Sequence, residues 1–235
     1  MPLVSDASKP VLPGAAGSDY ERYLRTDELL ALQKRADEWT HRDELLFQTV
    51  HQSSELWLQL CWTETDEAAL LIARGDIAAA LRLLRRANDC LKLVTAALDM
   101  LEHMSPWEYT EVRKALGHGS GFDSPGFGEL RRAGKALGEA FQAARDQAGL
   151  SLVEVYTRGR EHEELYNLAE QLIELDERIT VWRVRHFKVV QRTIGGDVVG
   201  TQGTPVEVMG RLINNSLYPE LWDVRNELTQ LNLPE

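Results

Sequence analysis

The chain has 235 residues, of which 43% are hydrophobic and 27% charged, a composition typical of a soluble globular protein with a substantial core. Lysine and arginine number 26 against 37 acidic residues, and the net charge of −11 disfavours binding to the phosphate backbone of nucleic acids. No stretch approaches about 18 consecutive apolar residues and the N-terminus lacks the pattern of a secretory signal, so we expect a cytoplasmic protein without a membrane span.

Residues 1–18 are rich in proline, glycine, alanine and serine, and predict a flexible N-terminal arm. From residue 19 to residue 235 the chain predicts a single all-helical domain. Its helices are expected over about 20–37, 42–73, 76–103, 106–116, 127–148, 161–194 and 205–215. No segment alternates convincingly with the period of two that a β-strand needs. The predicted fold class is therefore all-α, a helical bundle with two unusually long helices at 42–73 and 161–194.

Residues that start and stop helices mark several of these boundaries. Thr40 and Asp76 are expected as N-caps, and the Ser-Pro pair at 105–106 supplies a cap followed by proline at the first helical position. Gly75 and Gly195 are expected as C-terminal stops.

The helix over 161–194 carries a histidine in an otherwise apolar face. Its inward positions recur at spacings of three and four and are Leu165, Leu168, Leu172, Leu175, Ile179, Trp182, His186 and Val189. Because burying an unpaired polar ring costs about 1 to 3 kcal/mol, His186 needs either a hydrogen-bond partner or a metal ion.

A second histidine lies in a similar stripe on the helix over 42–73. That stripe consists of Phe47, His51, Ser54, Leu58 and Cys61. Two hydrogen-bonded core imidazoles are one interpretation of the pair, and a cofactor held between facing helices, such as a haem with one axial histidine, is the other. The stripes lack an HExxH motif and the carboxylates of a di-iron site, which disfavours a non-haem centre. Cys61 and Cys90 both fall inside helical patterns, so we expect two reduced core thiols.

Two glycine-rich segments are expected to be loops. HGSGF at 118–122 and GTQGT at 200–204 lack the strand and helix that flank a phosphate-binding loop, which disfavours nucleotide binding. The glycine content of 195–205 is typical of a lid that closes on a substrate, with a plain connector as the alternative. Tyr109 and Arg113 lie one turn apart and share a helix face, which would bind a carboxylate if it points inward and nothing if it points outward.

Several strings in order resemble the tryptophan 2,3-dioxygenases, all-helical enzymes that use haem b and molecular oxygen to open the indole ring of L-tryptophan. The strings are YERYLRTDELLALQ (20–33), HRDELLFQTVHQSSELWLQL (41–60), MSPWEYTEVRKALGHGSGFDS (104–124), LYNLAEQLIELDERITVWRVRHFKVVQRTIG (165–195) and YPELWDVR (218–225). The resemblance implies a haem-binding oxygenase domain over 19–235. It also implies insertion of both oxygen atoms into the indole C2–C3 bond of L-tryptophan or a close analogue, giving an N-formylkynurenine-type product.

The resemblance further implies roles for single residues. His186 would be the proximal ligand of the haem iron, and His51 would be the catalytic histidine on the distal side, near the indole nitrogen. The implied cofactor-binding residues are Ser120, Gly121, Phe122 and His186. The implied substrate-binding residues are Tyr20, Tyr23, Leu24, Phe47, His51, Tyr109, Arg113 and Thr201. Within this set, Tyr109 and Arg113 match the family's carboxylate-binding pair, and Thr201 matches the loop threonine at the amino-acid end of the substrate.

The chain departs from the family's strings in three places. The family's lid reads GTGGSSG, whereas this chain has GTQGTPV, with Gln202 and Pro205 in place of a small residue and a flexible one. The family's SGFQS is SGFDS here, which adds the carboxylate of Asp123. The segment between residues 127 and 161 is shorter than in full-length members, which leaves the usual tetramer open. A homo-oligomer, dimer or tetramer, is still expected, because Tyr20 and Tyr23 would enter a neighbour's pocket.

Three functions are compatible with these observations. Dioxygenation of L-tryptophan or an analogue is preferred, because the chain retains Tyr109, Arg113, Thr201 and His51. The second is haem-dependent monooxygenation of a tryptophan derivative to an oxindole in secondary-metabolite biosynthesis. The third is a haem-binding sensor or an inactive helical scaffold, which would not turn over substrate.

Overall fold

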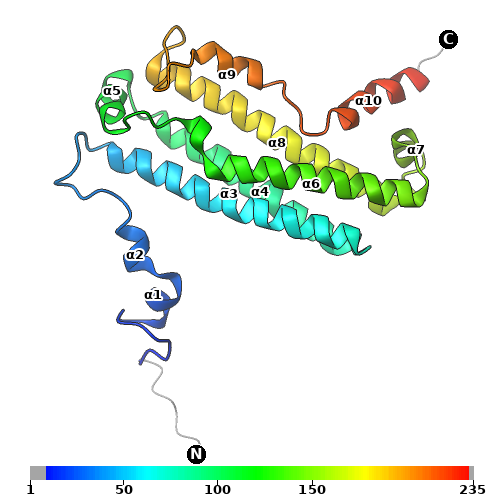
Figure 1. Ribbon diagram of the computed structural model, residues 1–235, viewed down its shortest axis with the longest axis horizontal. Coiled ribbons are helices and arrows are strands. Elements are labelled where there is room, and N and C mark those ends of the chain that lie inside the picture. Colours follow the sequence, from blue (N-terminus) through cyan, green and yellow to red (C-terminus); the bar gives the residue numbers. More distant parts are fainter. Residues whose placement is uncertain (1–8, 233–235) are drawn as a thin grey trace, which may run out of the picture.

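Four long helices lie side by side in the computed structural model, which describes residues 9–232 (Figure 1). They are α3 (Glu44–Ala73), α4 (Ile77–Leu101), α6 (Pro125–Ala148) and α8 (Glu163–Ile194). Helix α3 packs against α4 and α6, and α8 packs against the same two helices. No strand occurs within the described range, where one isolated β-bridge joins Val199 to Pro205. The all-α prediction is confirmed, and α3 and α8 are the two longest helices, α8 spanning roughly 48 Å at 1.5 Å per residue.

The core forms where the apolar stripes of these helices meet. Leu58 of α3, Leu84 and Leu91 of α4 and Leu172 of α8 are almost completely buried in one cluster. Each such side chain stabilises the fold by about 1.5 to 3 kcal/mol relative to an exposed position. Both cysteines are free and buried, as predicted, and burial raises the pKa of the Cys61 thiol to about 12. These thiols are therefore core side chains at neutral pH.

Most of the predicted helix boundaries are confirmed by hydrogen bonds at the caps. Asp76 accepts from the backbone N–H of Ala79, and Ser105 forms a reciprocal capping box with Glu108 at the start of α5 (Pro106–Ala115). Gly195 ends α8 with φ of 94°, a conformation that favours glycine. These caps fix where the long helices end and the loops begin.

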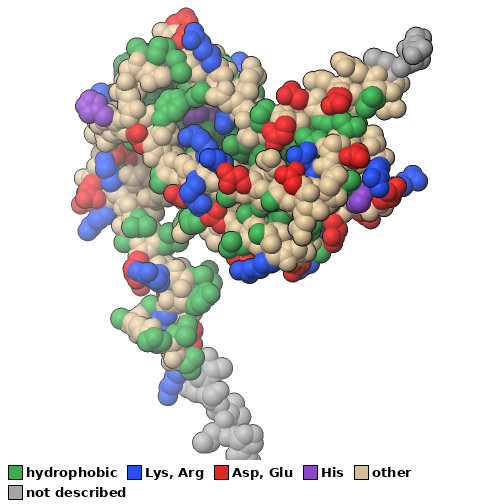
Figure 2. All heavy atoms as spheres, turned by 45° about the vertical axis from the view of Figure 1, so that its right-hand side comes forward, with side chains coloured by type: hydrophobic (Ala, Val, Ile, Leu, Met, Phe, Trp, Pro, Cys, Tyr) green, Lys and Arg blue, Asp and Glu red, His purple; other side chains and the backbone are tan. Residues whose placement is uncertain are grey.

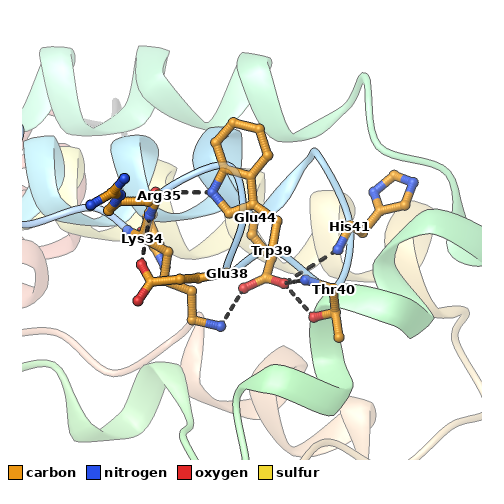
Figure 3. Close-up of polar contacts among 8 residues, drawn as sticks. Lys34, Arg35, Glu38, Trp39, Thr40, His41 and Glu44 are labelled. Atoms are coloured by element: carbon orange, nitrogen blue, oxygen red, sulfur yellow. Dashed lines mark hydrogen bonds and ion pairs between the residues drawn. The ribbon is translucent and has the colours of Figure 1, made fainter.

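The predicted N-cap at Thr40 is wrong, because α3 begins at Glu44 and Thr40 is bonded to that residue's side chain (Figure 3). The buried Glu44 carboxylate accepts from the hydroxyl and backbone N–H of Thr40, and from the backbone N–H of His41. Lys34 completes the cluster with an ion pair, in which its Nζ lies 2.6 Å from Oε2 of Glu44. Burial alone would raise the pKa of Glu44, but the Lys34 ammonium and these hydrogen bonds outweigh it and lower the pKa to about 2. The cluster anchors the segment before α3 to the bundle.

The predicted helix over 20–37 is also wrong. It divides into α1 (Asp19–Leu24) and α2 (Thr26–Leu30), because Arg25 adopts a left-handed conformation with φ of 53° and ψ of 42°. Such a residue costs about 1 to 2 kcal/mol. Neither helix has a buried residue, so no core packing holds this segment as one continuous helix. Figure 1 shows both helices projecting away from the bundle.

The segment before α1 was predicted as a flexible arm over residues 1–18. Residues 1–8 lie outside the described residues. Residues 9–18 fold back on α1, where Asp19 accepts from the backbone N–H groups of Val11 and Leu12, and Arg22 donates to the carbonyl of Ala16. We use the name N-terminal arm for residues 9–30 from here on.

Shorter helices cover the two ends of the bundle. Helices α5 and α9 (Val206–Leu212) lie at one end, and α7 (Leu152–Thr157) and α10 (Pro219–Leu231) at the other (Figure 1). Helices α7 and α10 were not predicted from the sequence, although Ser151 and Glu154 form a capping box and Pro219 occupies a first helical turn. Within the described range, no helix is long and apolar enough to cross a membrane.

Candidate active site

A largely apolar cavity of about 980 Å³ lies at the end of the bundle that carries α5 and α9. Its walls come from the N-terminal half of α3, the C-terminal half of α8, the turn at 119–122 and the loop at 200–204. Figure 2 shows that this face of the molecule is hollowed, with hydrophobic side chains around the opening. The volume is at the upper end of the range of about 300 to 1,000 Å³ that is usual for ligand and cofactor sites.

His186 lines this cavity from α8, held by an aromatic stack. Its ring lies nearly parallel to that of Trp182, with centroids 4.7 Å apart and an angle of 12° between the planes. Trp182 in turn packs against Phe127 of α6, with 4.0 Å between the ring centroids. Burial, with a smaller effect from His51, lowers the pKa of His186 to about 4. The imidazole is therefore neutral at pH 7, and among the described residues its nitrogens have no hydrogen-bond partner, which leaves a lone pair free for a metal ion.

His51 lines the same cavity from α3. Its Nδ1 lies 2.7 Å from the carbonyl oxygen of Phe47, and since a carbonyl can only accept, Nδ1 carries the proton. The ring also stacks on that of Phe47 with centroids 4.0 Å apart. His51 is exposed to the open cavity, yet partial desolvation by the surrounding protein lowers its pKa, against the opposing effects of the Phe47 carbonyl and Glu55. His51 is thus a neutral imidazole whose Nε2 can accept a hydrogen bond.

The turn at 119–123 packs beside His186. Ser120 and Asp123 form a capping box around the short helix η1 (Gly121–Asp123), in which the serine hydroxyl accepts from Phe122 and the carboxylate accepts from the Ser120 N–H. A Cβ atom on Gly121 would lie 3.9 Å from Cε1 of His186, at ordinary contact distance. Ser120, Gly121 and Phe122, which we expect to bind the cofactor, all line the cavity.

The loop at 198–206, called the lid loop below, closes another side of the cavity. Thr201 lines the cavity and donates its hydroxyl to the carbonyl of Gly119 at 2.5 Å. Because the proton of this hydroxyl is used, the oxygen faces any bound ligand as a hydrogen-bond acceptor. The lid loop therefore rests on the 119–123 turn.

Tyr109 and Arg113 are both near the cavity, but they occupy different places. Tyr109 lines it and lies 6.2 Å from Phe47 between ring centroids. Burial raises the pKa of the Tyr109 phenol, so the hydroxyl stays a donor at neutral pH. Arg113 is not part of the cavity wall and donates to the carbonyl of Val199 in the lid loop at 2.9 Å. That contact uses one of the five N–H donors of the guanidinium.

The three predicted residues of the N-terminal arm are not brought to this cavity within the chain. Tyr20, Tyr23 and Leu24 are 69%, 78% and 45% exposed on α1. Figure 2 shows further hydrophobic side chains gathered on the same arm, away from the hollow. If these residues contribute to a site, it is the site of another copy.

Two arginines of the cavity wall were missed by the sequence analysis. Arg131 comes from α6 and Arg183 from α8, where it donates to the carbonyl of Asn215. Burial lowers the pKa of Arg183, Asp176 opposes this and Arg131 adds to it. Arg183 stands three residues before His186 and so shares its helix face, a signal that the sequence contained. No comparable signal pointed to Arg131.

This set of residues fits a haem better than a bare metal ion. Among the described residues, no group of three or more His, Cys, Asp or Glu side chains could hold such an ion. A haem brings four nitrogen ligands of its own and needs one protein imidazole, an apolar cavity and partners for its two carboxylates. His186, the apolar walls, and Arg131 with Arg183 meet these three requirements.

The comparisons with known proteins agree with this geometry. The family model described as tryptophan 2,3-dioxygenase matches residues 6–139 and 130–228. The tryptophan 2,3-dioxygenase of Bacillus thuringiensis subsp. konkukian (strain 97-27) is 30% identical, over 89% of this chain and 92% of its own length. That of Caulobacter vibrioides is 31% identical over 89% and 98%, and that of Serratia proteamaculans is 28% identical over 96% of both chains.

The alignments also show that this chain lacks residues that a relative has. The alignment with the Bacillus protein spans 263 positions, more than this chain has residues, so the relative carries residues that this chain lacks. The two parts of the family match overlap at residues 130–139, within α6, inside the segment 127–161 that we expect to be shorter than in full-length members. Because the family model matches the chain from residue 6 to residue 228 and the fold is all-helical, the chain belongs to the tryptophan 2,3-dioxygenase family as a shortened member.

Proposed function

We propose that the chain is a haem-dependent oxygenase that inserts both atoms of O2 into the indole C2–C3 bond of L-tryptophan or a close analogue. The observation that carries this proposal is the pair of neutral histidines, His51 and His186, lining one apolar cavity from two different helices. The printed names of the relatives supply the reaction and the substrate class. Residues 19–235 would form one functional domain.

The cofactor in this proposal is haem b, held by His186 as the proximal ligand. Stacking on Trp182 restricts the rotation of the imidazole, so its free nitrogen points in a fixed direction. Arg131 and Arg183 would pair with the carboxylates of the haem, and the turn at Ser120, Gly121 and Phe122 would run along its edge. When bound, the haem supplies an iron at which molecular oxygen can be activated.

His51 would orient the indole through a hydrogen bond. An indole N–H is a donor only, and Nε2 of His51 is left as an acceptor because Nδ1 donates to Phe47. Phe47 and Tyr109 would form the apolar walls on either side of the ring. Such positioning can lower the activation free energy by several kcal/mol, on the order of 7 kcal/mol where the geometry is well fixed.

The amino-acid end of the substrate would be bound near the lid loop. The hydroxyl oxygen of Thr201 acts as an acceptor, which suits a substrate ammonium group, because an ammonium is a donor only. Tyr109 and Arg113 would donate to the substrate carboxylate. Since Arg113 also holds Val199 of the lid loop, carboxylate binding and the position of that loop are linked through one side chain.

The N-terminal arm would complete the cavity of a second copy. Tyr20, Tyr23 and Leu24 are exposed on a segment that projects from the bundle, an arrangement that leaves them available to another subunit. We therefore propose a homo-oligomer, with these residues forming part of the indole pocket of the neighbouring chain.

An experiment with labelled oxygen tests the reaction. The ferrous holoenzyme is incubated with L-tryptophan and ¹⁸O2, and the product mass is measured. Two labelled atoms without net consumption of electrons support dioxygenation. One labelled atom in the product would instead support the monooxygenase that forms an oxindole. In that reaction the other oxygen atom becomes water, with two electrons from a reductant and two protons.

Two further outcomes would overturn other parts of the proposal. A Soret band without turnover of L-tryptophan or its ring-methylated or side-chain-methylated analogues would point to a sensor or an inactive scaffold. A Soret band that is unchanged in the His186→Ala variant would refute His186 as the iron ligand.

A further inference from the structure

The lid loop is closed on itself by backbone contacts. Val199 and Pro205 form an isolated antiparallel bridge, and the N–H of Gly200 donates to the carbonyl of Thr204 at 2.9 Å. Gly203, with φ of 77°, makes the tight turn between them possible. The loop therefore behaves as one small unit whose position depends on its contacts with the rest of the chain.

Three side-chain hydrogen bonds hold this unit to the cavity rim. Two of them reach backbone carbonyls, from Arg113 to Val199 and from Thr201 to Gly119. The third joins two side chains, because Nε2 of Gln202 donates to Oδ2 of Asp123 at 2.7 Å. The same carboxylate oxygen accepts from the N–H of Ser120 at 3.0 Å, so Asp123 connects the lid loop to the capping box of the turn beside His186.

Gln202 and Asp123 are two of the positions at which the resemblance described above leads us to expect a difference from the family. The two residues lie 79 residues apart in the chain and meet in one charge-assisted hydrogen bond.

We propose that Gln202 and Asp123 form a latch that holds the lid loop against the 119–123 turn and thereby positions Thr201 at the cavity wall. Gln202 and Thr201 are consecutive and both line the cavity, so the latch sets the shape of the wall as well as the position of the loop. The two latch residues are positioning residues, because they act through Thr201. The effect on substrate binding rests on the proposed function, whereas the closure of the loop does not.

Hydrogen exchange of the full-length protein, followed by mass spectrometry, tests the closure directly. In the Gln202→Glu variant two carboxylates face each other, and we expect exchange in peptides covering 198–206 to accelerate about fivefold, as one lost charge-assisted hydrogen bond implies. The reversed pair, Gln202→Glu with Asp123→Asn, restores the bond in the opposite direction. Exchange in that double variant should return to within twofold of the original protein.

Matched controls separate the latch from general effects of charge or folding. Asp197 is exposed directly before the lid loop, and its side chain forms no hydrogen bond or ion pair within the described residues, so Asp197→Asn changes a charge without altering the latch. Exchange at 198–206 should be unaltered in that variant, and exchange in α8 core peptides should be unaltered in all four proteins. Unchanged exchange in Gln202→Glu, or a double variant that exchanges as fast as Gln202→Glu, would overturn the proposal.

The positioning role is read from steady-state kinetics with L-tryptophan. We expect Gln202→Glu to raise KM about fivefold with kcat changed less than twofold, and the reversed pair to restore KM. Accelerated exchange with an unchanged KM would refute the positioning role. If the original protein shows no turnover, the proposed function fails, and the exchange experiment alone decides whether the latch exists.

Discussion

His186 stacks on Trp182, one turn earlier in α8, with 4.7 Å between ring centroids and 12° between ring planes. Stacking on the Trp182 side chain restricts rotation of the His186 imidazole without occupying either of the imidazole nitrogens. A ligand with a fixed direction and a free lone pair is what binding of a metal ion requires.

Removing this stack should weaken haem retention. In Trp182→Ala we expect about tenfold weaker haem binding, since aromatic stacking contributes about 0.5 to 1.5 kcal/mol beyond the area it buries. Trp182→Phe keeps an aromatic ring and should stay within about threefold of the original protein. Titration of the apoprotein with haemin, followed at the Soret band, measures this, and the exposed Val184→Ala on the same helix serves as the control. Equal affinities of all four proteins would contradict the role of the stack.

Gly126, in the first turn of α6, should tolerate no side chain. A Cβ atom there would lie 2.6 Å from Oε2 of Glu55 and 2.7 Å from Cβ of Leu58 on α3, so the helices would have to separate. We expect Gly126→Ala to lower the free energy of unfolding by about 1 to 3 kcal/mol, measured by urea denaturation. Gly128→Ala, two residues later, meets nothing within 4 Å and should raise it by about 0.5 to 1 kcal/mol. A loss of similar size in Gly128→Ala would contradict the role of the contact with α3, because alanine has the higher helix propensity and meets nothing at that position.

The Glu44 cluster should make stability depend on pH in the acid range. The pKa of Glu44 is lowered from 4.5 to about 2, so its contribution is fully present above pH 4.5 and is lost as the pH falls towards 2. The shift corresponds to about 3 kcal/mol at neutral pH. Relative to the original protein, Glu44→Gln should therefore unfold more easily at pH 7 and equally easily near pH 2. Asp37→Asn, which changes an exposed carboxylate in the same segment, should show no such convergence.

The hydrogen bond from the indole to His51 can be tested from both partners. A substrate methylated on the indole nitrogen has no N–H to donate, so its kcat/KM should be lower than that of L-tryptophan with the original protein. In His51→Ala this preference should shrink about fivefold, because the acceptor is missing as well. A preference of the same size in both proteins would assign it to the bulk of the methyl group.

Mixing two inactive variants tests the exchange of the N-terminal arm. Tyr23→Ala affects the arm, and His186→Ala affects the cavity. If arms enter neighbouring subunits, a mixed dimer contains one cavity with an intact His186 and an intact arm. Equimolar mixing should then restore about a quarter of the original activity. Mixtures no more active than the separate variants would show that each arm serves its own chain or none.

The spacing of apolar residues was sufficient to predict the bundle. The ends of α3 at Ala73 and of α8 at Ile194 agree with the sequence prediction, because glycines follow both helices and the apolar stripes stop there. The same reasoning failed for the N-terminal arm, where helix-forming residues are present but no face is buried. Helical propensity alone did not reveal the break at Arg25, which depends on the absence of core packing.

The candidate site could be predicted only in part, for a related reason. Periodicity indicated that His51 and His186 face inward, and the resemblance supplied their roles. Neither the periodicity nor the resemblance could show that Arg113 holds the lid loop, that Arg131 lines the cavity, or that Gln202 contacts Asp123. Each of these contacts joins segments that are distant in the chain and depends on how whole elements pack.

Helix α8 runs unbroken from Leu165 in the core to Ile194, and the lid loop follows Gly195 almost at once. His186 belongs to the same continuous helix as the core residues before it, so it cannot move independently of them. The same helix, α8, lines the cavity through His186 and leads into the lid loop. Substitutions that tighten the packing around Leu172 should therefore also stiffen the site, which couples heat resistance to the rate at which ligand enters and leaves.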